Sequence, residues 1–347
     1  MVALSVRSAF DLALRALELP SGSEVLLTAL TVPDMARIVE MHGLVPVPVD
    51  IDEDGEIRIA SLNGAITSKS RMIVVAHLFG HRSALDDLLG IARRHNLLVV
   101  EDLAQGFHRV GECGHPESDL AMFSFGPIKT ASALGGAVVR VKSAALCRTM
   151  SELLGTDPIQ SSTAFARRLL RFTLLKTVSG ERTAWLFRRC VERLGYDFDT
   201  LANSVTRGFT GSNLAAQLRR QPSTPLLRLL RRRWRTYDFA RIARRTEMGR
   251  RFGARIGRSH DPSHSFWVYP LVVDAPSALR DRLRDAGFDA THLARMAVVP
   301  AADASRVPAG ARRVLERMVV LPWYPDMPDD AIDAMARIVG TIEPNPA

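Results

Sequence analysis

Short apolar runs alternate with amphipathic segments over the first 141 residues, and this alternation constrains the fold more than any other feature. Residues 24–28, 71–76 and 97–100 have the length and composition of buried strands. Segments of helical periodicity stand between them, at 33–42 and 85–95. Strand–helix–strand units join parallel strands by right-handed crossovers. We therefore expect a large α/β domain whose sheet is mostly parallel and flanked by helices.

Three further runs complete the predicted sheet. Residues 45–49 are apolar but include prolines at 46 and 48. This favours the edge of the sheet, because proline cannot donate a ladder hydrogen bond. Residues 120–125 and 137–141 are two more short strands, expected to continue the parallel series. Ahead of the sheet, residues 5–17 have the apolar face of a helix.

Polar side chains follow two of these runs where each run ends. Asp102 follows the run at 97–100, and Ser124 lies in the run at 120–125, with Lys129 shortly after it. Open α/β sheets bind ligands at the carboxyl ends of strands, so these three side chains are expected to share one crevice. A carboxylate, a hydroxyl and an amine suit a cofactor with a ring nitrogen, a phosphate and an aldehyde. These are the features of pyridoxal 5′-phosphate (PLP).

Each of these residues also has an ordinary structural explanation. A lysine after a strand is usually a solvated loop residue, and an aspartate such as Asp102 is favoured as a helix N-cap. We prefer the cofactor interpretation because the three residues occur together in this order.

At these residues the sequence resembles the DegT/StrS family of PLP-dependent sugar aminotransferases, which have fold type I. The family's V-x-E-D-x-A-Q run is similar to residues 99–105 (VVEDLAQ), and its S-F-x-x-x-K run to residues 124–129 (SFGPIK). Its paired glycines match Gly135 and Gly136. Residues 76–80 (AHLFG) look like its V-H-L-Y-G turn.

Another part of the resemblance is the segment at 24–52, which is similar to the family's run ending in V-D-I-D. The clear resemblance covers roughly residues 5–145, and residues 321–325 (LPWYP) resemble the family more weakly.

The resemblance implies a role for each matching residue. Lys129 would bind PLP as a Schiff base and carry the proton during amino transfer. Asp102 would pair with the protonated pyridine nitrogen, which keeps the ring an electron sink. Gln105 would lie against the ring near its hydroxyl, and Ser124 would bind the phosphate.

The sequence departs from the family at the phosphate loop. The family's S-G-T-x-A-L corresponds to residues 5–10, where valine and arginine replace glycine and threonine. A helix N-terminus there would still offer backbone N–H groups, with Ser5 and Arg7 as candidate phosphate ligands. Val32 stands where the family usually stacks an aromatic side chain on the PLP ring, and His77 is a candidate replacement. Family members also usually have tens of residues before this loop, so we expect a truncated gene start or a real loss.

The composition changes after residue 142. Residues 161–260 hold 23 Lys+Arg against 6 Asp+Glu, although the whole chain has a net charge of only +9. Helices rich in arginine and leucine are predicted over 163–195 and 214–256. The family has here a G-x-N-x-R stretch that contributes to the neighbouring subunit's active site, and residues 207–209 and 211–213 are its only candidates.

Three explanations of the basic segment stay open. It could be a solvated face with oligomer contacts, or a binding site for an anionic ligand such as a nucleotide-linked sugar. Amphipathic helices within 163–195 could also make peripheral contact with a membrane. Nucleic-acid binding is not predicted, because no recognised module interrupts the enzyme-like layout.

Length and composition predict a cytoplasmic protein of more than one domain. The 347 residues exceed one average domain. There is no run of eighteen apolar residues and no predicted signal peptide. The three cysteines are widely spaced and match neither a metal site nor a disulfide framework.

We expect three parts. Residues 1–150 would form the core of the PLP-binding domain, 151–258 a helical segment for substrate or interface, and 259–347 a small C-terminal α+β domain. In this last part, a strand is predicted over 265–273 and helices over 277–286 and 331–339.

The resemblance predicts an aminotransferase that works as a homodimer. It would move an amino group from an amino acid, glutamate by family habit, to a keto group on a nucleotide-linked deoxy-sugar. Lysine at position 129 favours transfer, because family members that dehydrate sugars carry histidine there. Two alternatives remain: a family aminotransferase acting on a non-sugar carbonyl, and a family member without catalysis that acts as a binding or scaffold protein.

Overall fold

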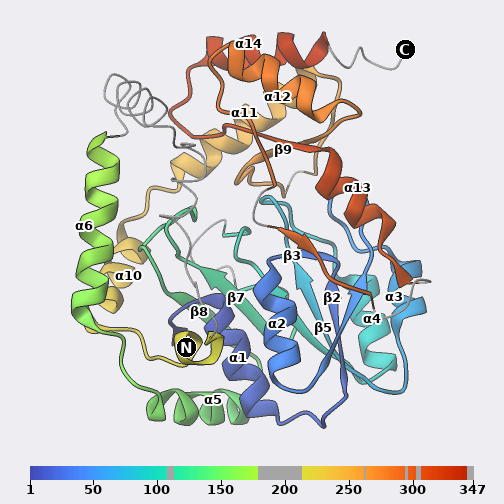
Figure 1. Cartoon of the computed structure of the whole chain (residues 1–347), viewed down its shortest axis with the longest axis vertical. Helices are drawn as coiled ribbons and strands as arrows, with labels where there is room; N and C mark the ends of the chain where they lie inside the picture. The colour runs from blue at the N-terminus through green and yellow to red at the C-terminus, as the bar shows by residue number, and fades with distance from the viewer. Residues whose placement is uncertain (108–112, 179–212, 262, 294–295, 302–305, 342–347) are drawn as a thin grey trace.

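The computed structural model describes residues 1–107, 113–178, 213–261, 263–293, 296–301 and 306–341 (Figure 1). Its centre is a sheet built from β1 (Val2–Ala3), β2 (Glu24–Thr28), β4 (Val45–Val49), β5 (Ser70–Ala76), β6 (Leu98–Asp102), β7 (Leu120–Ser124) and β8 (Ala137–Val141). The strand order is β1-β8-β7-β6-β5-β2-β4. Five neighbouring strands, from β4 to β7, are parallel, which confirms the predicted fold class. As its prolines predict, β4 lies at the edge.

The prediction that β8 continues the parallel series is wrong. β8 pairs with β7 in the antiparallel direction, with Ser124 opposite Ala137, and β1 pairs with β8 in the same sense. The cause is the connection, because residues 125–136 form a loop rather than the helical crossover that parallel strands need. We call residues 125–136, which include Lys129, the lysine loop.

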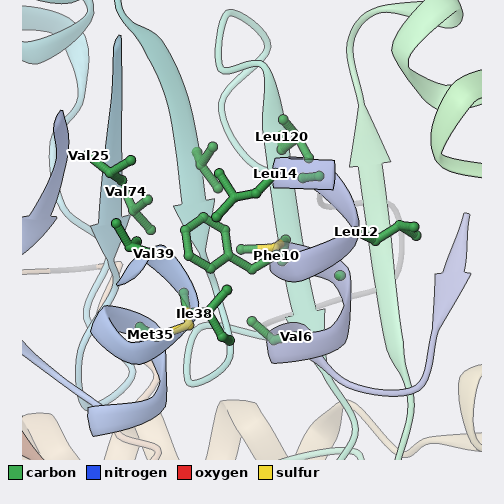
Figure 2. Close-up of a cluster of buried hydrophobic side chains, with 14 of the residues drawn as sticks. Val6, Phe10, Leu12, Leu14, Val25, Met35, Ile38, Val39, Val74 and Leu120 are labelled. Atoms are coloured by element: carbon green, nitrogen blue, oxygen red, sulfur yellow. The ribbon is translucent and has the colours of Figure 1, made fainter. Parts of the chain in front are cut away.

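Helices cover both faces of the sheet. One face packs against α1 (Val6–Leu17), α2 (Pro33–Met41) and α5 (Ala144–Thr156), and the other against α3 (Ile59–Ala65) and α4 (Asp86–Arg94). The strands alternate between the two cores, so that Val25 and Leu27 lie in the first and Leu26 in the second. Figure 2 shows Phe10 of α1 pointing toward α2 and the strands, where it is fully buried.

A second, antiparallel sheet lies at the other end of the molecule. It is formed by β9 (Tyr269–Val272), β10 (Thr291–His292) and β12 (Met318–Leu321). Three helices share its core, namely α11 (Ala240–Arg255), α12 (Pro276–Asp285) and α14 (Asp329–Gly340). Figure 1 shows these helices together at the top of the view. The division of the chain at residues 150 and 258 stays a prediction.

Two smaller elements join the C-terminal residues to the large sheet. The strand β11 (Ala297–Val298) pairs with β3 (Leu30–Thr31), which directly follows β2. The helix α13 (Ala309–Arg317) contributes Ala311 and Val314 to the same core as α3 and α4. The C-terminal residues therefore pack on both sheets.

The predicted strand over 265–273 is too long. The structure has β9 only from Tyr269, because Phe266 adopts a positive φ of 46° and ends any extended conformation before it. Residues 265–268 instead lie against the turn at 79–80. Ser265 N–H donates to the Gly80 carbonyl at 2.8 Å. A Cβ on Gly80 would lie 2.5 Å from the backbone nitrogen of Trp267, so only glycine allows this approach.

The basic segment is helical where the structure describes it. Its helices are α6 (Ser162–Val178), α9 (Leu214–Leu218) and α10 (Thr224–Thr236), followed by α11. The rest of the predicted helix over 163–195 lies outside the described residues, as do both candidate positions for the family's G-x-N-x-R stretch except Asn213. Asn213 caps α9 by accepting a hydrogen bond from Ala216 N–H at 3.0 Å. Within the described part of the chain, no helix has the length and apolarity needed to cross a membrane.

Candidate active site

The predicted site residues lie at the carboxyl ends of three adjacent strands. Asp102 is the last residue of β6, and Ser124 the last of the neighbouring β7. His77 directly follows β5, and its N–H donates to the Asp102 carbonyl at 3.0 Å. The structure therefore brings these three residues to one edge of the sheet, where open α/β sheets bind ligands.

The N-terminus of α1 reaches the same edge. Gly136 N–H donates to the Leu4 carbonyl at 2.9 Å, and β1 runs beside the start of β8. Ser5 then caps the helix, because its Oγ accepts a hydrogen bond from Ser8 N–H at 3.0 Å. The positive end of the helix dipole thus lies at the same end of the sheet as Ser124, as an anion such as a phosphate would require.

Asp102 is a buried carboxylate with 8% of its surface exposed. Within the described residues it forms no ion pair, and its Oδ1 accepts one hydrogen bond from Ala104 N–H at 2.9 Å. Burial raises its pKa above the usual value. The Ala104 hydrogen bond and the charges of Lys129, His77 and Arg7 act in the opposite direction but do not overcome burial. A cationic group bound beside Asp102 would offset this cost.

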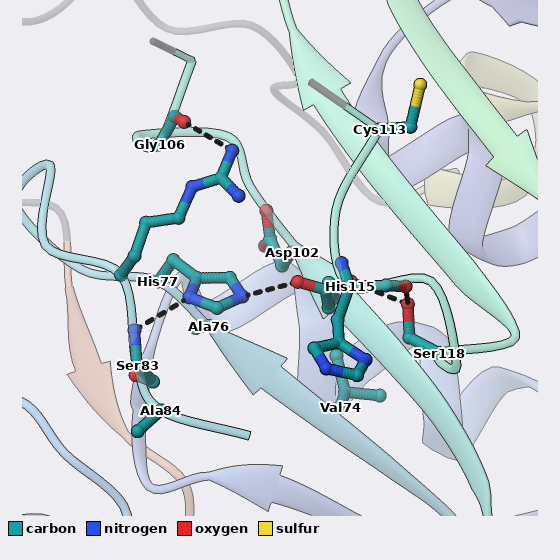
Figure 3. Close-up of polar contacts among 12 residues, drawn as sticks. Val74, Ala76, His77, Ser83, Ala84, Asp102, Gly106, Cys113, His115 and Ser118 are labelled. Carbon is teal, nitrogen blue, oxygen red and sulfur yellow. Dashed lines mark hydrogen bonds and ion pairs between the residues drawn. The ribbon is translucent and has the colours of Figure 1, made fainter. Parts of the chain in front are cut away.

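His77 and Glu101 form a buried pair beside Asp102. Glu101 Oε2 lies 3.1 Å from His77 Nε2, and His77 Nδ1 accepts a hydrogen bond from Ser83 N–H (Figure 3). The proton of the neutral ring is therefore on Nε2, which donates to Glu101. Both nitrogens of His77 thus have protein partners, which fixes its ring in the wall of the site. Its predicted stacking on PLP stays a prediction.

Further hydrogen bonds hold Glu101 in place. Its Oε1 accepts from Ser118 Oγ at 2.5 Å and from His115 N–H at 2.7 Å. Burial disfavours the charged carboxylate, but the bonds from His77, Ser118 and His115 outweigh it and hold the pKa of Glu101 below its usual value. The pKa values of these two neighbouring acids therefore shift in opposite directions. Within the described residues, Glu101 accepts several hydrogen bonds, whereas Asp102 accepts one.

Gln105 is fixed by the turn after β5. Its Oε1 accepts a hydrogen bond from Phe79 N–H at 2.6 Å, and its Nε2 lies 3.8 Å from the sulfur of Met296. Phe79, which donates this hydrogen bond, has a positive φ of 59°. The structure therefore places Gln105 between the turn and Met296.

Trp267 is a site residue that the sequence did not predict. The Nζ atom of Lys129 lies 4.4 Å from the centre of its ring, within the range of a cation–π interaction. The Nε1–H of Trp267 donates to the Ile128 carbonyl at 3.0 Å. Trp267 thus contacts both the amine of Lys129 and the backbone before it. The sequence gives no indication of this contact, because the run that contains Trp267 is typical of a strand.

Three arginines from the basic helices bind the lysine loop. Arg168 of α6 donates to the Leu134 carbonyl at 3.1 Å, and Arg233 of α10 donates to the Ser132 carbonyl at 3.0 Å. Arg245 of α11 is 6% exposed and donates to Thr130 Oγ1 at 3.3 Å. Part of the basic segment therefore holds the loop that carries Lys129, a role that none of the three sequence-based explanations included.

Residues 2–156 match the sequence model of the DegT/DnrJ/EryC1/StrS aminotransferase family. The similarity to this family covers less than half of the chain. Curated relatives include UDP-N-acetyl-3-dehydro-α-D-glucosamine 3-aminotransferase of Acidithiobacillus ferrooxidans, 36% identical over 149 residues. The dTDP-3-amino-3,4,6-trideoxy-α-D-glucose transaminase of Streptomyces venezuelae is 38% identical over 145 residues. The matches span 42% and 40% of this chain, and 40% and 38% of the relatives' lengths.

The likeness of fold extends much further than the likeness of sequence. The sugar aminotransferase CalS13 from Micromonospora echinospora matches 98% of this chain with a TM-score of 0.70, over 86% of its own length. The NtdA protein of Bacillus subtilis, whose structure holds bound cofactor PMP, matches 99% of this chain with a TM-score of 0.67, over 72% of its own. Identities of 19% and 17% make this a likeness of fold alone.

Two of the departures from the family lie together, at the first turns of α1 and α2. Arg7, in the first turn of α1, forms an ion pair with Asp34, in the first turn of α2. Val32 is the N-cap of α2 and packs at the edge of the core instead of offering a ring. Ser124 Oγ accepts a hydrogen bond from Gly126 N–H at 3.4 Å. Asp34 therefore neutralises part of the charge that Arg7 could offer to a phosphate.

Proposed function

We propose that this chain is a PLP-dependent aminotransferase that acts as a homodimer. Its amino donor is glutamate, and its acceptor is a keto group on a nucleotide-linked deoxy-sugar. The observation that carries the proposal is the buried carboxylate of Asp102 at the strand ends, which forms no ion pair within the described residues and whose charge also acts on Lys129. The names of the curated relatives support the substrate class, since both act on nucleotide-linked amino sugars by name.

The residues present fit PLP. Among the described residues Asp102 has no ion-pair partner, and a protonated pyridine nitrogen would supply one. The first turn of α1, with Ser5 and Ser124 beside it, suits the phosphate. Lys129 supplies the amine that PLP requires. Arg7 is a weaker phosphate ligand than its charge suggests, because Asp34 already pairs with it.

The chain's own residues would divide the work of amino transfer. PLP, when bound, supplies an electron sink for the carbon that carries the amino group. Asp102 would hold a proton at the ring nitrogen, and Gln105 would border the ring beside the turn at Phe79. Lys129 Nζ would accept the proton from the substrate carbon that carries the amino group. It would then donate this proton to the carbon on the other side of the amino nitrogen. The arginines on the lysine loop and the ring of Trp267 would hold Lys129 in place for this transfer.

Visible absorbance tests this function. Purified protein incubated with PLP should gain a visible band that disappears on addition of L-glutamate and returns with a nucleotide-linked keto-sugar. The Lys129→Ala variant should show none of these changes. Lys142→Ala is the matched control, because Lys142 donates to the Glu117 carbonyl and lies outside the site. A folded wild-type protein without the band would overturn the proposal. A band that does not change when glutamate is added would indicate a binding protein without catalysis.

A keto-substrate panel tests the acceptor. Amino transfer to nucleotide-linked keto-sugars, with no transfer to a cyclitol ketone or a lipid-linked ketone, is the expected result. The reverse preference would indicate an aminotransferase that acts on another class of substrate.

A further inference from the structure

The outer surface of α6 carries exposed leucines. Leu169, Leu170 and Leu174 are 44%, 60% and 56% exposed, and Leu227 on the neighbouring α10 is 40% exposed. These are all the leucines among the exposed large hydrophobic side chains of the described residues. The inner side of α6 is anchored, since Phe165 is 2% exposed and packs with Leu226 of α10. Single exposed leucines are ordinary, whereas three within two turns of one helix form a patch.

Basic residues surround this patch, and no acidic residue interrupts it. In the described segments 158–178 and 213–237 there are eleven Lys+Arg and no Asp or Glu. Apart from Arg233, which binds the lysine loop, seven of these basic side chains are exposed and form no ion pair within the described part of the chain: Arg167, Arg171, Lys176, Arg228, Arg231, Arg232 and Arg235. The two helices therefore present uncompensated positive charge.

The neighbouring helix α11 shows that this charge is not a general feature of the basic segment. Four of its arginines form ion pairs with aspartates near α14, namely Arg241, Arg244, Arg251 and Arg255. The chain thus neutralises the arginines of α11 from its own C-terminal residues. Within the described residues, the seven exposed basic side chains of α6 and α10 have no such acidic partner.

Leucine and arginine share one face of α6. Arg167, Leu170, Arg171 and Leu174 follow the spacing i, i+3, i+4 and i+7, which places them along one side of a helix. Figure 1 shows α6 at the outer edge of the molecule, with α10 beside it. We call this face of α6, with the exposed arginines of α10, the α6 surface.

We propose that the α6 surface binds anionic lipid membranes. Leucine side chains can enter the boundary between headgroups and acyl chains, while arginine side chains extend to the lipid phosphates. Anionic lipids also attract clustered basic residues by their surface potential. A second copy of the chain fits less well, because a two-fold contact centred on this face would oppose like charges. The binding is peripheral and independent of the proposed amino transfer.

Co-sedimentation of the full chain with vesicles tests this inference. The wild-type protein should sediment with phosphatidylcholine–phosphatidylglycerol vesicles and stay in solution with phosphatidylcholine alone, and high salt should release it. The variant Leu170→Gln/Arg171→Gln should lose affinity about tenfold, because it removes one apolar anchor and one charge. The matched control Ile59→Gln/Arg94→Gln removes the same groups from exposed positions on α3 and α4 and should bind as the wild type does.

Each other outcome overturns the inference. The inference is wrong if the wild-type protein does not sediment with the anionic vesicles. It is also wrong if the α6 variant and the wild type bind these vesicles equally. If the α6 variant instead changes the oligomeric state, measured by analytical ultracentrifugation, the face is a contact between copies. Thermal melting checks that both variants are folded. PLP absorbance should be unchanged in both, so failure of membrane binding is distinguishable from failure of the proposed function.

Discussion

Lys129 Nζ lies 4.4 Å from the centre of the Trp267 ring, although the two residues are far apart in the sequence. The contact depends on the close approach of residues 265–268 to the turn at Gly80, where a Cβ would not fit. The C-terminal residues therefore take part in shaping the candidate site that the N-terminal family region supplies.

Removing Trp267 should slow amino transfer without changing substrate binding. The Trp267→Ala variant loses the cation–π contact and the hydrogen bond to the Ile128 carbonyl, together about 1.5 kcal/mol, or about tenfold in kcat. Trp267→Phe keeps a ring face and should lose less. Steady-state kinetics should show an unchanged KM for the keto-sugar. Tyr324→Ala, at a half-exposed aromatic residue, is the control, and an unaltered kcat in Trp267→Ala would contradict the account.

The arginine contacts should limit opening of the lysine loop. Arg233→Gln removes the hydrogen bond to the Ser132 carbonyl, worth about 1 kcal/mol, so amide exchange over residues 125–136 should rise about fivefold. Arg232→Gln removes the same charge from an exposed neighbour and should leave that exchange unchanged. Hydrogen–deuterium exchange read by mass spectrometry separates the two variants. Equal protection in both would mean that the loop does not depend on Arg233.

Asp102→Asn should stabilise the PLP-free protein while it lowers activity. Because burial raises the pKa of Asp102, its charge costs stability at neutral pH, and this cost disappears as the pH falls toward its ordinary value of 3.8. The melting temperature of the variant should therefore exceed that of the wild type at pH 7, with a difference that narrows on acidification. Its amino transfer should fall about a hundredfold. A variant that melts lower at pH 7 would show that the carboxylate is paired in solution.

Glu101→Gln should have the opposite effect on stability. The pKa of Glu101 is held below its ordinary value of 4.5, so its charge stabilises the fold above that pH, and this contribution is lost as the pH falls through the lowered value. Urea unfolding at pH 7 should show a loss of about 2 kcal/mol in the variant, with the two proteins converging at low pH. A difference that stays constant with pH would exclude the charged network as its cause.

The parts of the fold that follow local patterns could be predicted from the sequence. The bounds of β2 and β8 are those expected, and α1 covers nearly the whole helix expected over residues 5–17, because these elements follow the pattern of neighbouring residues. The antiparallel direction of β8 could not be predicted, because it depends on how the lysine loop folds. The start of β9 differs from the prediction for a similar reason: Phe266 turns where it meets Gly80, and this contact is between distant segments.

The candidate site was only partly visible in the sequence. Asp102 and Ser124 could be brought together because strand ends in a parallel sheet share an edge. The contact of Trp267 with Lys129 could not be predicted, because it joins separate parts of the fold. Composition also treats all arginines alike, whereas the structure separates those that bind the lysine loop, such as Arg168, from those that face outward, such as Arg171.

Chemical trapping of PLP tests the central claim most directly. The protein is incubated with PLP, reduced with sodium borohydride, digested and analysed by mass spectrometry. The account predicts one dominant pyridoxyl phosphate adduct, on Lys129, which is absent from the Lys129→Ala variant and retained in Lys142→Ala. A folded protein with no adduct on Lys129, or with adducts spread over its other lysines, would contradict it.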